Sequence, residues 1–411
     1  MSPRGRGEDR LRSLLREAPL PGAEAAERRG RALVEAAFAA RRSEERGHRR
    51  TALPRLALAL AVAALLAALV LSPAGAAVRH WIGDVFEPGV RNAEPALTRI
   101  PGGGRLAVDS PAGPWVVRPD GSRRLLGRYR EATWSPHGLF LAVAAGRTLS
   151  AVEPDGTPRW SIAAPARVED PRWSPSGFRI AYRSGGMLRV VHADGTSDSL
   201  VDRSVMPVAP SWAPGGLHQL AYVDGRGRVA VRDVDSGRLL GRGDALRGIE
   251  SLEWGPAGSL VEASATRIRL RPIELDKLSG DLRLGTPRPL PLPGRGRIAS
   301  VAISPAGNKV AVLRQLGGAL PRAEVDFIDL GSGGVRRLLR TPGRLGQLAW
   351  SPDGSRLLVT WPQADQWLFV PVSGRGKVEA VGDISRQFNP GGRAPGRFPT
   401  VSGWCCLATP R

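Results

Sequence analysis

Cysteine is nearly absent from this 411-residue chain, since the only two are Cys405 and Cys406, adjacent and close to the carboxyl end. Two such cysteines cannot form the disulfide framework of a small secreted domain. Neighbouring cysteines usually cannot bridge to each other without distortion. We therefore expect two partly buried thiols or a link to another chain, and we keep Cys405 and Cys406 as a candidate redox pair.

Metal-ligand and catalytic patterns are missing as well. The five histidines are far apart, and the chain has no Cys-x-x-Cys pair, so we predict no zinc site. No Gly-x-Ser-x-Gly nucleophile elbow occurs. The acids that stand out lie in turns, where they stabilise the turn rather than face each other across a glycosidase cleft: Asp120, Asp155, Asp194 and Asp235. We predict no catalytic residue, no metal and no cofactor, and a chain that is not an enzyme.

Lysine is scarce too, because only Lys277, Lys309 and Lys377 accompany the many arginines that give a formal net charge of +21. The arginines are scattered along the chain rather than clustered. Scattered charge is typical of a solvated surface. A nucleic-acid partner is therefore not predicted.

No charged residue occurs from Leu56 to Val78. At a rise of 1.5 Å per residue such a helix is roughly 35 Å long, enough for a hydrocarbon core of about 30 Å. Six arginines lie shortly before this run, and the positive-inside rule places the amino terminus in the cytoplasm. We predict a single transmembrane helix at 56–78, a stalk at 79–97 and an extracytoplasmic remainder. The alternative is secretion after cleavage near Ala76, in the small-x-small sequence Ala74-Gly75-Ala76.

Residues 1–55 are expected to form a basic cytoplasmic segment, with fourteen arginines and eight acids. Two short amphipathic helical patterns are visible between residues 8 and 46, separated by Pro19, Pro21 and Gly22. Helices this short cannot form a core of their own. They are a candidate binding site for a cytoplasmic partner, or a juxtamembrane segment without one.

Beyond the stalk, one short motif recurs six times. The first residues of successive copies lie 39, 39, 42, 49 and 47 positions apart, which is the period of a repeat architecture. The copies are defined by Trp134, Pro136, Gly138; Trp173, Pro175, Gly177; Trp212, Pro214, Gly216; Trp254, Pro256, Gly258; Ser304, Pro305, Gly307; and Trp350, Pro352, Asp353, Gly354.

Each copy predicts a short strand that ends at the tryptophan, a turn, and three further strands. Proline pre-sets φ near −65° and glycine supplies the positive φ that a reversal needs. In one copy the later strands are expected at 139–143, 148–152 and 159–162, and in the next at 179–182, 188–192 and 197–201. Asp-Gly turns such as Asp155-Gly156 join the last two strands. Four strands per forty residues indicate a blade of a β-propeller.

A degenerate copy at 100–108 gives seven blades, with six as the alternative if it is only a lead-in. The propeller is expected at 98–388, with no helix after residue 78. The Pro-rich insertion at 285–297 is expected to be a spacer. The Pro/Gly-rich tail at 389–411 is expected to return to the first blade and close the ring.

The repeated tryptophan offers an aromatic platform for ligands, but one per blade at a fixed position favours packing between neighbouring blades. The Trp-Ser-Pro-Asp-Gly motif, followed by an apolar strand and an Asp-Gly turn, resembles the WD40-like (PD40) repeat of the TolB propeller family over residues 98–381. Only the copy at 350–354 has the family's aspartate, which is Asp353. The resemblance implies an extracytoplasmic propeller of the kind found in periplasmic scaffolds, sensors and peptidase gating domains.

Taken together, these features predict a membrane-anchored propeller that is a non-catalytic binding module for an extracytoplasmic protein or envelope polymer. One alternative is a single-pass transmembrane sensor that signals through its cytoplasmic helices. Another is a propeller-based hydrolase or lyase.

Overall fold

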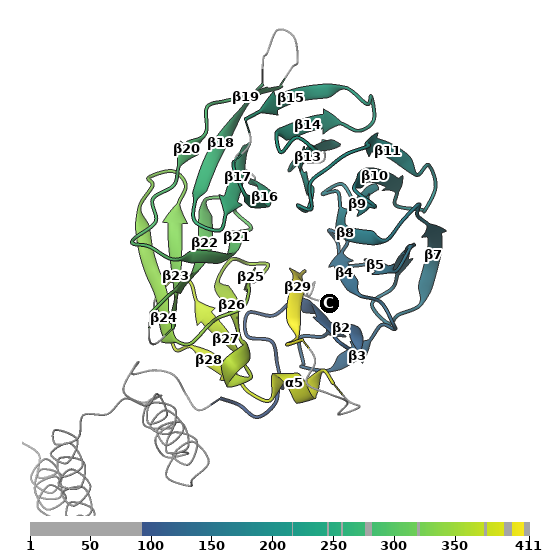
Figure 1. The fold of residues 1–411 in the computed structure, drawn as a ribbon. Coiled ribbons are helices and arrows are strands. Elements are labelled where there is room, and N and C mark those ends of the chain that lie inside the picture. The colour runs from purple at the N-terminus through teal and green to yellow at the C-terminus, as the bar shows by residue number, and fades with distance from the viewer. Residues whose placement is uncertain are drawn as a thin grey trace, which may run out of the picture. The chain divides into compact units, whose positions relative to one another are not determined.

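The computed structural model describes residues 93–406 except 216, 245, 256–257, 276–281, 319–320, 374–375 and 390–396. These residues form seven antiparallel sheets around a central axis, a seven-bladed β-propeller (Figure 1). The prediction of an all-β propeller with seven four-stranded blades is confirmed, and the six-bladed alternative is wrong. The predicted transmembrane run at 56–78 and the segment 1–55 lie outside the described residues. Within the described part, no helix is long and apolar enough to cross a membrane.

The strands of each blade follow one another outwards from the central axis of the ring (Figure 1). From the innermost strand outwards, blade 1 contains β29 (Thr400–Cys405), β1 (Arg105–Ser110), β2 (Gly113–Val117) and β3 (Arg123–Leu125). Blade 2 contains β4 (Glu131–Trp134), β5 (Leu141–Ala145), β6 (Thr148–Val152) and β7 (Pro158–Ala163). Blade 3 contains β8 (Val168–Trp173), β9 (Arg179–Ser184), β10 (Met187–His192) and β11 (Ser199–Asp202). Blade 4 contains β12 (Ser211–Trp212), β13 (Gln219–Val223), β14 (Val229–Asp233) and β15 (Leu239–Gly243).

Blade 5 contains β16 (Ile249–Gly255), β17 (Ser259–Ser264), β18 (Ile268–Leu275) and β19 (Leu282–Leu284). Blade 6 contains β21 (Arg297–Ile303), β22 (Lys309–Leu316), β23 (Arg322–Asp329) and β24 (Val335–Pro342). Blade 7 contains β25 (Leu348–Trp350), β26 (Arg356–Trp361), β27 (Gln366–Pro371) and β28 (Glu379–Val381). The expected spacer 285–297 adds a further strand, β20 (Arg288–Pro289), which pairs with β18.

The burial of each strand follows from its place in the blade. The second strand of blade 2, β5, is buried along most of its length, because neighbouring blades cover both of its faces. The outermost strand, β7, is covered on one side only and alternates between exposed and half-buried residues. In blade 2, small and branched residues therefore fill the two middle strands, and Arg159 is tolerated on the outermost one.

The carboxyl-terminal strand closes the ring. β29 pairs antiparallel with β1, with Trp404 opposite Leu106, and supplies the innermost strand of blade 1 (Figure 1). The first blade is thus built from both ends of the propeller sequence. Pairing the two ends removes the free strand edges that an open ring would expose.

Two short helices occur in the part of the chain that the structure describes, although we expected no helix after residue 78. They are the 3-10 helix η1 (Pro362–Ala364) and α5 (Ile384–Gln387). α5 lies beside blades 1 and 7, and Phe388 at its end packs its ring 5.9 Å from that of Trp115 and 5.2 Å from that of Trp367. One-turn helices have too few residues to show a 3.6-residue period, so periodicity does not detect them.

Candidate interaction face

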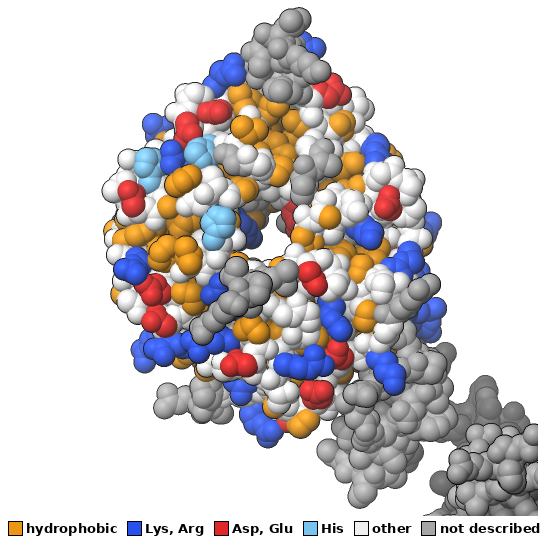
Figure 2. Space-filling view, turned by 180° about the vertical axis from the view of Figure 1, so that it is seen from behind, with side chains coloured by type: hydrophobic (Ala, Val, Ile, Leu, Met, Phe, Trp, Pro, Cys, Tyr) orange, Lys and Arg blue, Asp and Glu red, His pale blue; other side chains and the backbone are white. Residues whose placement is uncertain are grey.

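The motif turns gather on one face of the ring. Each blade is an antiparallel meander, so its first and third turns lie at the same end of the strands. We call this side the motif face, because the first turn carries the Trp-Ser-Pro-x-Gly motif. The described histidines, His137, His192 and His218, all lie in or beside these turns. Figure 2, where histidine is pale blue, therefore shows the motif face.

The turn of blade 7 shows why the motif folds as it does. Gly354 takes φ of +68°, a conformation that side chains rarely adopt. The Asp353 carboxylate accepts hydrogen bonds from the Ser351 hydroxyl (2.6 Å) and the Ser355 backbone N–H (3.0 Å). Burial opposes ionisation of Asp353, but these hydrogen bonds outweigh it and lower the pKa of the carboxyl. Asp353 is therefore part of the scaffold. Pro256 and Gly216, in two other copies, lie outside the described residues.

The repeated tryptophans lie between blades. Trp134, Trp173, Trp212 and Trp350 are each at most 9% exposed. The ring of Trp350 stacks on Phe327 of blade 6 at 5.1 Å, and its indole N–H donates to the Ala302 carbonyl of that blade (3.0 Å). These rings pack against the preceding blade and do not form an exposed platform for ligands.

Three apolar side chains project from the motif face. Leu139, Phe178 and Leu217 are 63%, 64% and 57% exposed, in blades 2, 3 and 4. Each directly follows the last glycine of its motif, so the three occupy the same repeat position on consecutive blades. We call them the apolar ridge. Hydrophobic side chains gather near the histidines in Figure 2. Blades 5, 6 and 7 have Ser259, Asn308 and Ser355 at this position.

A polar cluster links blades 3 and 4 beside the ridge. Ser176 Oγ lies 3.0 Å from His218 Nε2, and His218 Nδ1 lies 2.5 Å from Asp235 Oδ2. Arg179 Nη2 donates to Asp235 Oδ1 at 3.0 Å. Burial opposes ionisation of Asp235, but the hydrogen bond from His218 and the nearby Arg179 charge outweigh it and lower the pKa. We expected Asp235 to stabilise its own turn, but its carboxylate is engaged by His218 from the motif turn of blade 4 and by Arg179 at the start of β9.

The order serine, histidine, aspartate is that of a hydrolase triad, yet the surroundings do not support acyl transfer. The N–H of Gly177 donates to the Ser174 carbonyl (2.9 Å), and the N–H of Phe178 donates to Ser176 Oγ itself (3.3 Å). Neither N–H is left to stabilise an oxyanion. The cluster therefore acts as a polar link between two blades.

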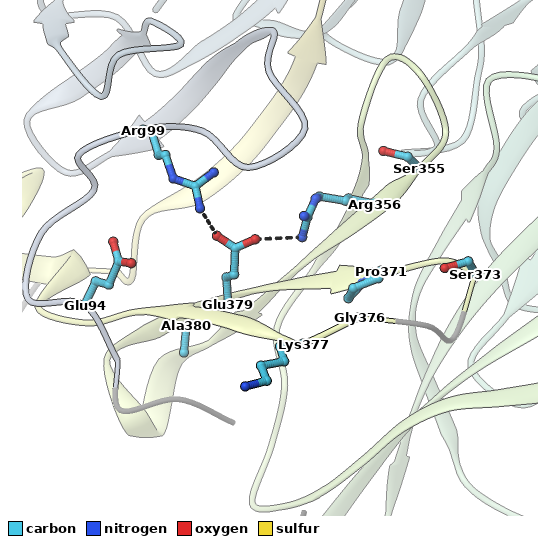
Figure 3. A pocket seen from close by; sticks show the side chains of 10 residues that line it. All are labelled: Glu94, Arg99, Ser355, Arg356, Pro371, Ser373, Gly376, Lys377, Glu379 and Ala380. Atoms are coloured by element: carbon cyan, nitrogen blue, oxygen red, sulfur yellow. Dashed lines mark hydrogen bonds and ion pairs between the residues drawn. The ribbon is translucent and has the colours of Figure 1, made fainter. Parts of the chain in front are cut away.

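The other half of the motif face is basic and holds two cavities. One, of about 420 Å³, lies in blade 7 and is lined by Arg99, Arg356, Lys377 and Glu379 among others (Figure 3). We call it the Glu379 cavity. The second, of about 330 Å³, lies in blade 6 and is lined by Lys309, Phe327, Asp329 and Arg336 among others. In the lower part of Figure 2, basic and acidic side chains are frequent among the hydrophobic ones.

Carboxyl groups also connect the blades near the axis. Glu131 accepts a hydrogen bond from the N–H of Asp170 in the next blade (2.8 Å), and Glu253 accepts one from Ile303 (3.2 Å). Burial raises the pKa of Glu253 to about 7. Burial and the nearby Glu131 charge raise the pKa of Asp109 to about 7 as well. No group of three or more potential metal ligands occurs among the described residues.

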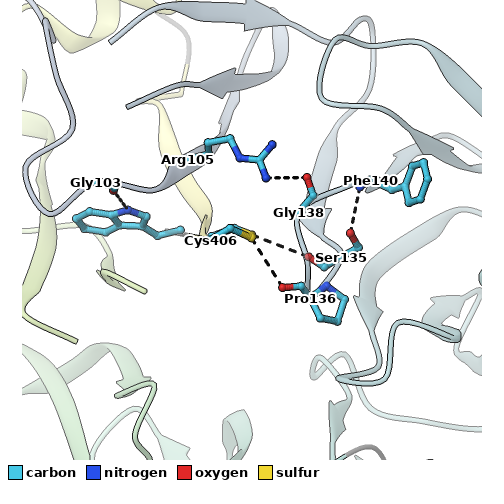
Figure 4. Close-up of a disulfide and its surroundings, with 9 residues drawn as sticks. Gly103, Arg105, Ser135, Pro136, Gly138, Phe140 and Cys406 are labelled. Carbon is cyan, nitrogen blue, oxygen red and sulfur yellow. Dashed lines mark hydrogen bonds between the residues drawn. A yellow bond between two sulfur atoms is a disulfide. The ribbon is translucent and has the colours of Figure 1, made fainter. Parts of the chain in front are cut away.

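The cysteines lie at the end of the closing strand. The structure joins Cys405 and Cys406 in a disulfide, so our expectation of free thiols or an intermolecular link differs from it (Figure 4). Cys406 has φ of +52°, and its Sγ lies 3.8 Å from the Pro136 carbonyl of blade 2. Nearby, Arg105 donates to the Gly138 carbonyl (2.8 Å). The pair therefore sits where the closing strand meets a motif turn.

Comparison with known proteins defines the fold class. No family model matches the chain, and no curated protein matches its sequence. The β-propeller domain of Cps50 (Swd1) from Myceliophteria thermophila aligns with a TM-score of 0.52 at 17% identity, covering 67% of this chain and 95% of that one. A chain of the mitotic checkpoint complex aligns with a TM-score of 0.51 at 18% identity, covering 70% of this chain and 93% of that one. The fold is that of a seven-bladed, WD40-like β-propeller, and membership of the TolB-like family remains a prediction.

Proposed function

We propose that this chain is a non-catalytic binding module whose motif face engages a protein or envelope polymer. The apolar ridge carries the proposal, because three large apolar side chains stay exposed at one repeat position on three adjacent blades. Single exposed apolar residues are common on soluble proteins, whereas an aligned set on a rigid scaffold is typical of interaction surfaces. An exposed aromatic such as Phe178 can fill a pocket on a partner and dominate the binding energy.

The fold supports a protein partner. One chain of similar fold belongs to the mitotic checkpoint complex, an assembly of proteins. At 18% identity this likeness concerns the fold alone, so the identity of the partner of this chain does not follow from it. The ridge itself favours a protein with an apolar patch over a uniformly charged polymer.

The ridge is tested by replacing Leu139, Phe178 and Leu217 together with serine in the full-length chain. We expect partners that co-purify with the wild-type chain to be lost, with an unchanged melting temperature because the three side chains are exposed. A matched control replaces Leu125 and Leu200, each 37% exposed, with serine. If the ridge variant keeps the same partners as the wild type, the proposal is wrong.

We further propose that the propeller is extracytoplasmic and held by the run at 56–78. The support is the length of that uncharged run and the arginines that precede it. A reporter active only outside the cytoplasm, fused after Arg411, should be active. Activity of a cytoplasm-specific reporter at the same position would overturn this orientation.

The absence of catalysis is the third part of the proposal. It is supported by the backbone N–H groups of Gly177 and Phe178 beside Ser176, because both already donate hydrogen bonds within the motif turn. The full-length chain should hydrolyse an activated ester no faster than a Ser176→Ala variant does. Turnover that disappears in that variant would establish a hydrolase instead.

A further inference from the structure

The Glu379 cavity has two arginines directed at one carboxylate. Arg99 comes from the segment before β1, Arg356 begins β26, and Glu379 begins β28 (Figure 3). Arg99 Nη2 donates to Glu379 Oε2 at 2.5 Å, and Arg356 Nη1 lies 3.0 Å from Oε1. Three separate parts of the chain thus build a cavity in which a carboxylate is held between two guanidinium groups.

The cavity has more donors than its own carboxylate satisfies. Arg356 Nη1 is a buried atom that has a charge partner but no aligned hydrogen bond. Lys377, which is exposed in the turn between β27 and β28, adds a third cation to the lining. The acids of the lining are Glu379 and the exposed Glu94, so the cations exceed the acids. Guanidinium groups prefer planar, two-oxygen partners, and Glu379 shows that a carboxylate fits between them.

The volume of about 420 Å³ lies within the range of sites that hold a small ligand or a few side chains. We propose that this cavity binds a carboxylate of an acidic polypeptide segment, seated on Arg99, Arg356 and Lys377. In the free protein Glu379 pairs with Arg99 and Arg356, so it competes with the carboxylate of the ligand for these arginines. The inference rests on the proposed function and names the chemistry of the partner.

The competitor role of Glu379 gives the sharpest test. A fluorescein-labelled tetraglutamate peptide is titrated into the full-length chain and followed by fluorescence anisotropy at low salt. Glu379→Gln removes the resident charge and should tighten binding by about fivefold, since both guanidinium groups then lack an internal ion pair. A purely structural role for Glu379 predicts weaker binding or no change, which would overturn the proposal.

The cations are tested in the opposite direction. Arg356→Gln should weaken peptide binding by about tenfold, and Lys377→Gln by about threefold. Lys377 is exposed, so its variant keeps the test valid if Arg356→Gln does not fold. Arg226→Gln, an exposed arginine in a turn of the opposite face, should leave binding unchanged. Equal loss in the Arg226 variant would mean that net charge alone attracts the peptide and would overturn the site.

Two further arms separate the outcomes. Inorganic phosphate at the peptide concentration should not displace the peptide, and displacement would overturn the carboxylate assignment. A tetraglutamine peptide, which has no side-chain carboxylates, should not bind. Binding of this peptide would also overturn the carboxylate assignment. If the ridge variant loses its partners while Arg356→Gln keeps both partners and peptide, the inference fails and the proposed function stands.

Discussion

Glu253 shows how a single half-buried acid ties the stability of the ring to pH. Its carboxyl accepts the N–H of Ile303 from the next blade, and burial raises its pKa to about 7. In the unfolded chain the pKa is about 4.3. Between these values the folded state binds the proton more tightly, so the contribution of Glu253 to stability falls as pH rises through this window and is constant outside it.

We therefore expect Glu253→Gln to gain stability relative to the wild type as pH rises. A glutamine keeps an oxygen for the Ile303 N–H but does not titrate. The difference in free energy of unfolding should grow by about 1 to 3 kcal/mol between pH 5 and pH 8, measured by urea denaturation. Glu250→Gln, an exposed acid on the same strand, is the control. Parallel pH curves for Glu253→Gln and the wild type would contradict this account.

At the scale of the element, the motif turn of blade 7 depends on the three hydrogen bonds that Asp353 accepts from Ser351 and Ser355. Asp353→Ala should destabilise the chain by about 1 kcal/mol. The reverse change, Ala306→Asp in blade 6, places a carboxylate acceptor at the same motif position. It should stabilise the chain by roughly a few tenths of a kcal/mol. Thermal unfolding of both variants checks this pair, and a shift of the same sign in both would be inconsistent with a turn-stabilising role.

The strands were largely predictable because turn residues and apolar runs alternate at short range. The strand at Thr148–Val152 has its predicted bounds. The strand expected at 139–143 instead begins at Leu141, since Leu139 stays in the motif turn. That error concealed the ridge, because an apolar residue after the glycine resembles the start of a buried strand. The signal that identifies the ridge is the residue after the last glycine, which is large and apolar in three consecutive copies.

Contacts between turns of different blades were not predictable from the repeat. Asp235 follows the pattern of a turn acid, yet His218 reaches its carboxylate from another turn and Arg179 from the start of β9. Likewise, Arg99 and Glu379 are 280 positions apart. Such pairs depend on how neighbouring blades pack against each other. The sequence pattern within one repeat contains no information on which residues of different blades come into contact. The insertion at 285–297 and the tail, which break the repeat, supply scaffold strands rather than the residues of the ridge.

For the whole molecule, pairing of β29 with β1 closes the ring. Ending the chain at residue 396 removes β29 and exposes the edge of β1 together with buried contacts of Leu106 and Val108. We expect this variant to melt at a markedly lower temperature and to aggregate through the open edge. Ending the chain at residue 406 keeps β29 and serves as the control. Differential scanning calorimetry distinguishes the two, and equal melting temperatures would contradict a role for closure.

The motif face as a whole is the central claim, with its apolar half on blades 2 to 4 and its basic half on blades 6 and 7. The most direct measurement is photo-crosslinking in intact cells with a photoreactive amino acid at position 178, compared with position 226 on the opposite face. A discrete crosslinked protein at position 178 that is absent at 226 is the result we predict. Equal crosslinking at the two positions, or crosslinking at 226 alone, would contradict it.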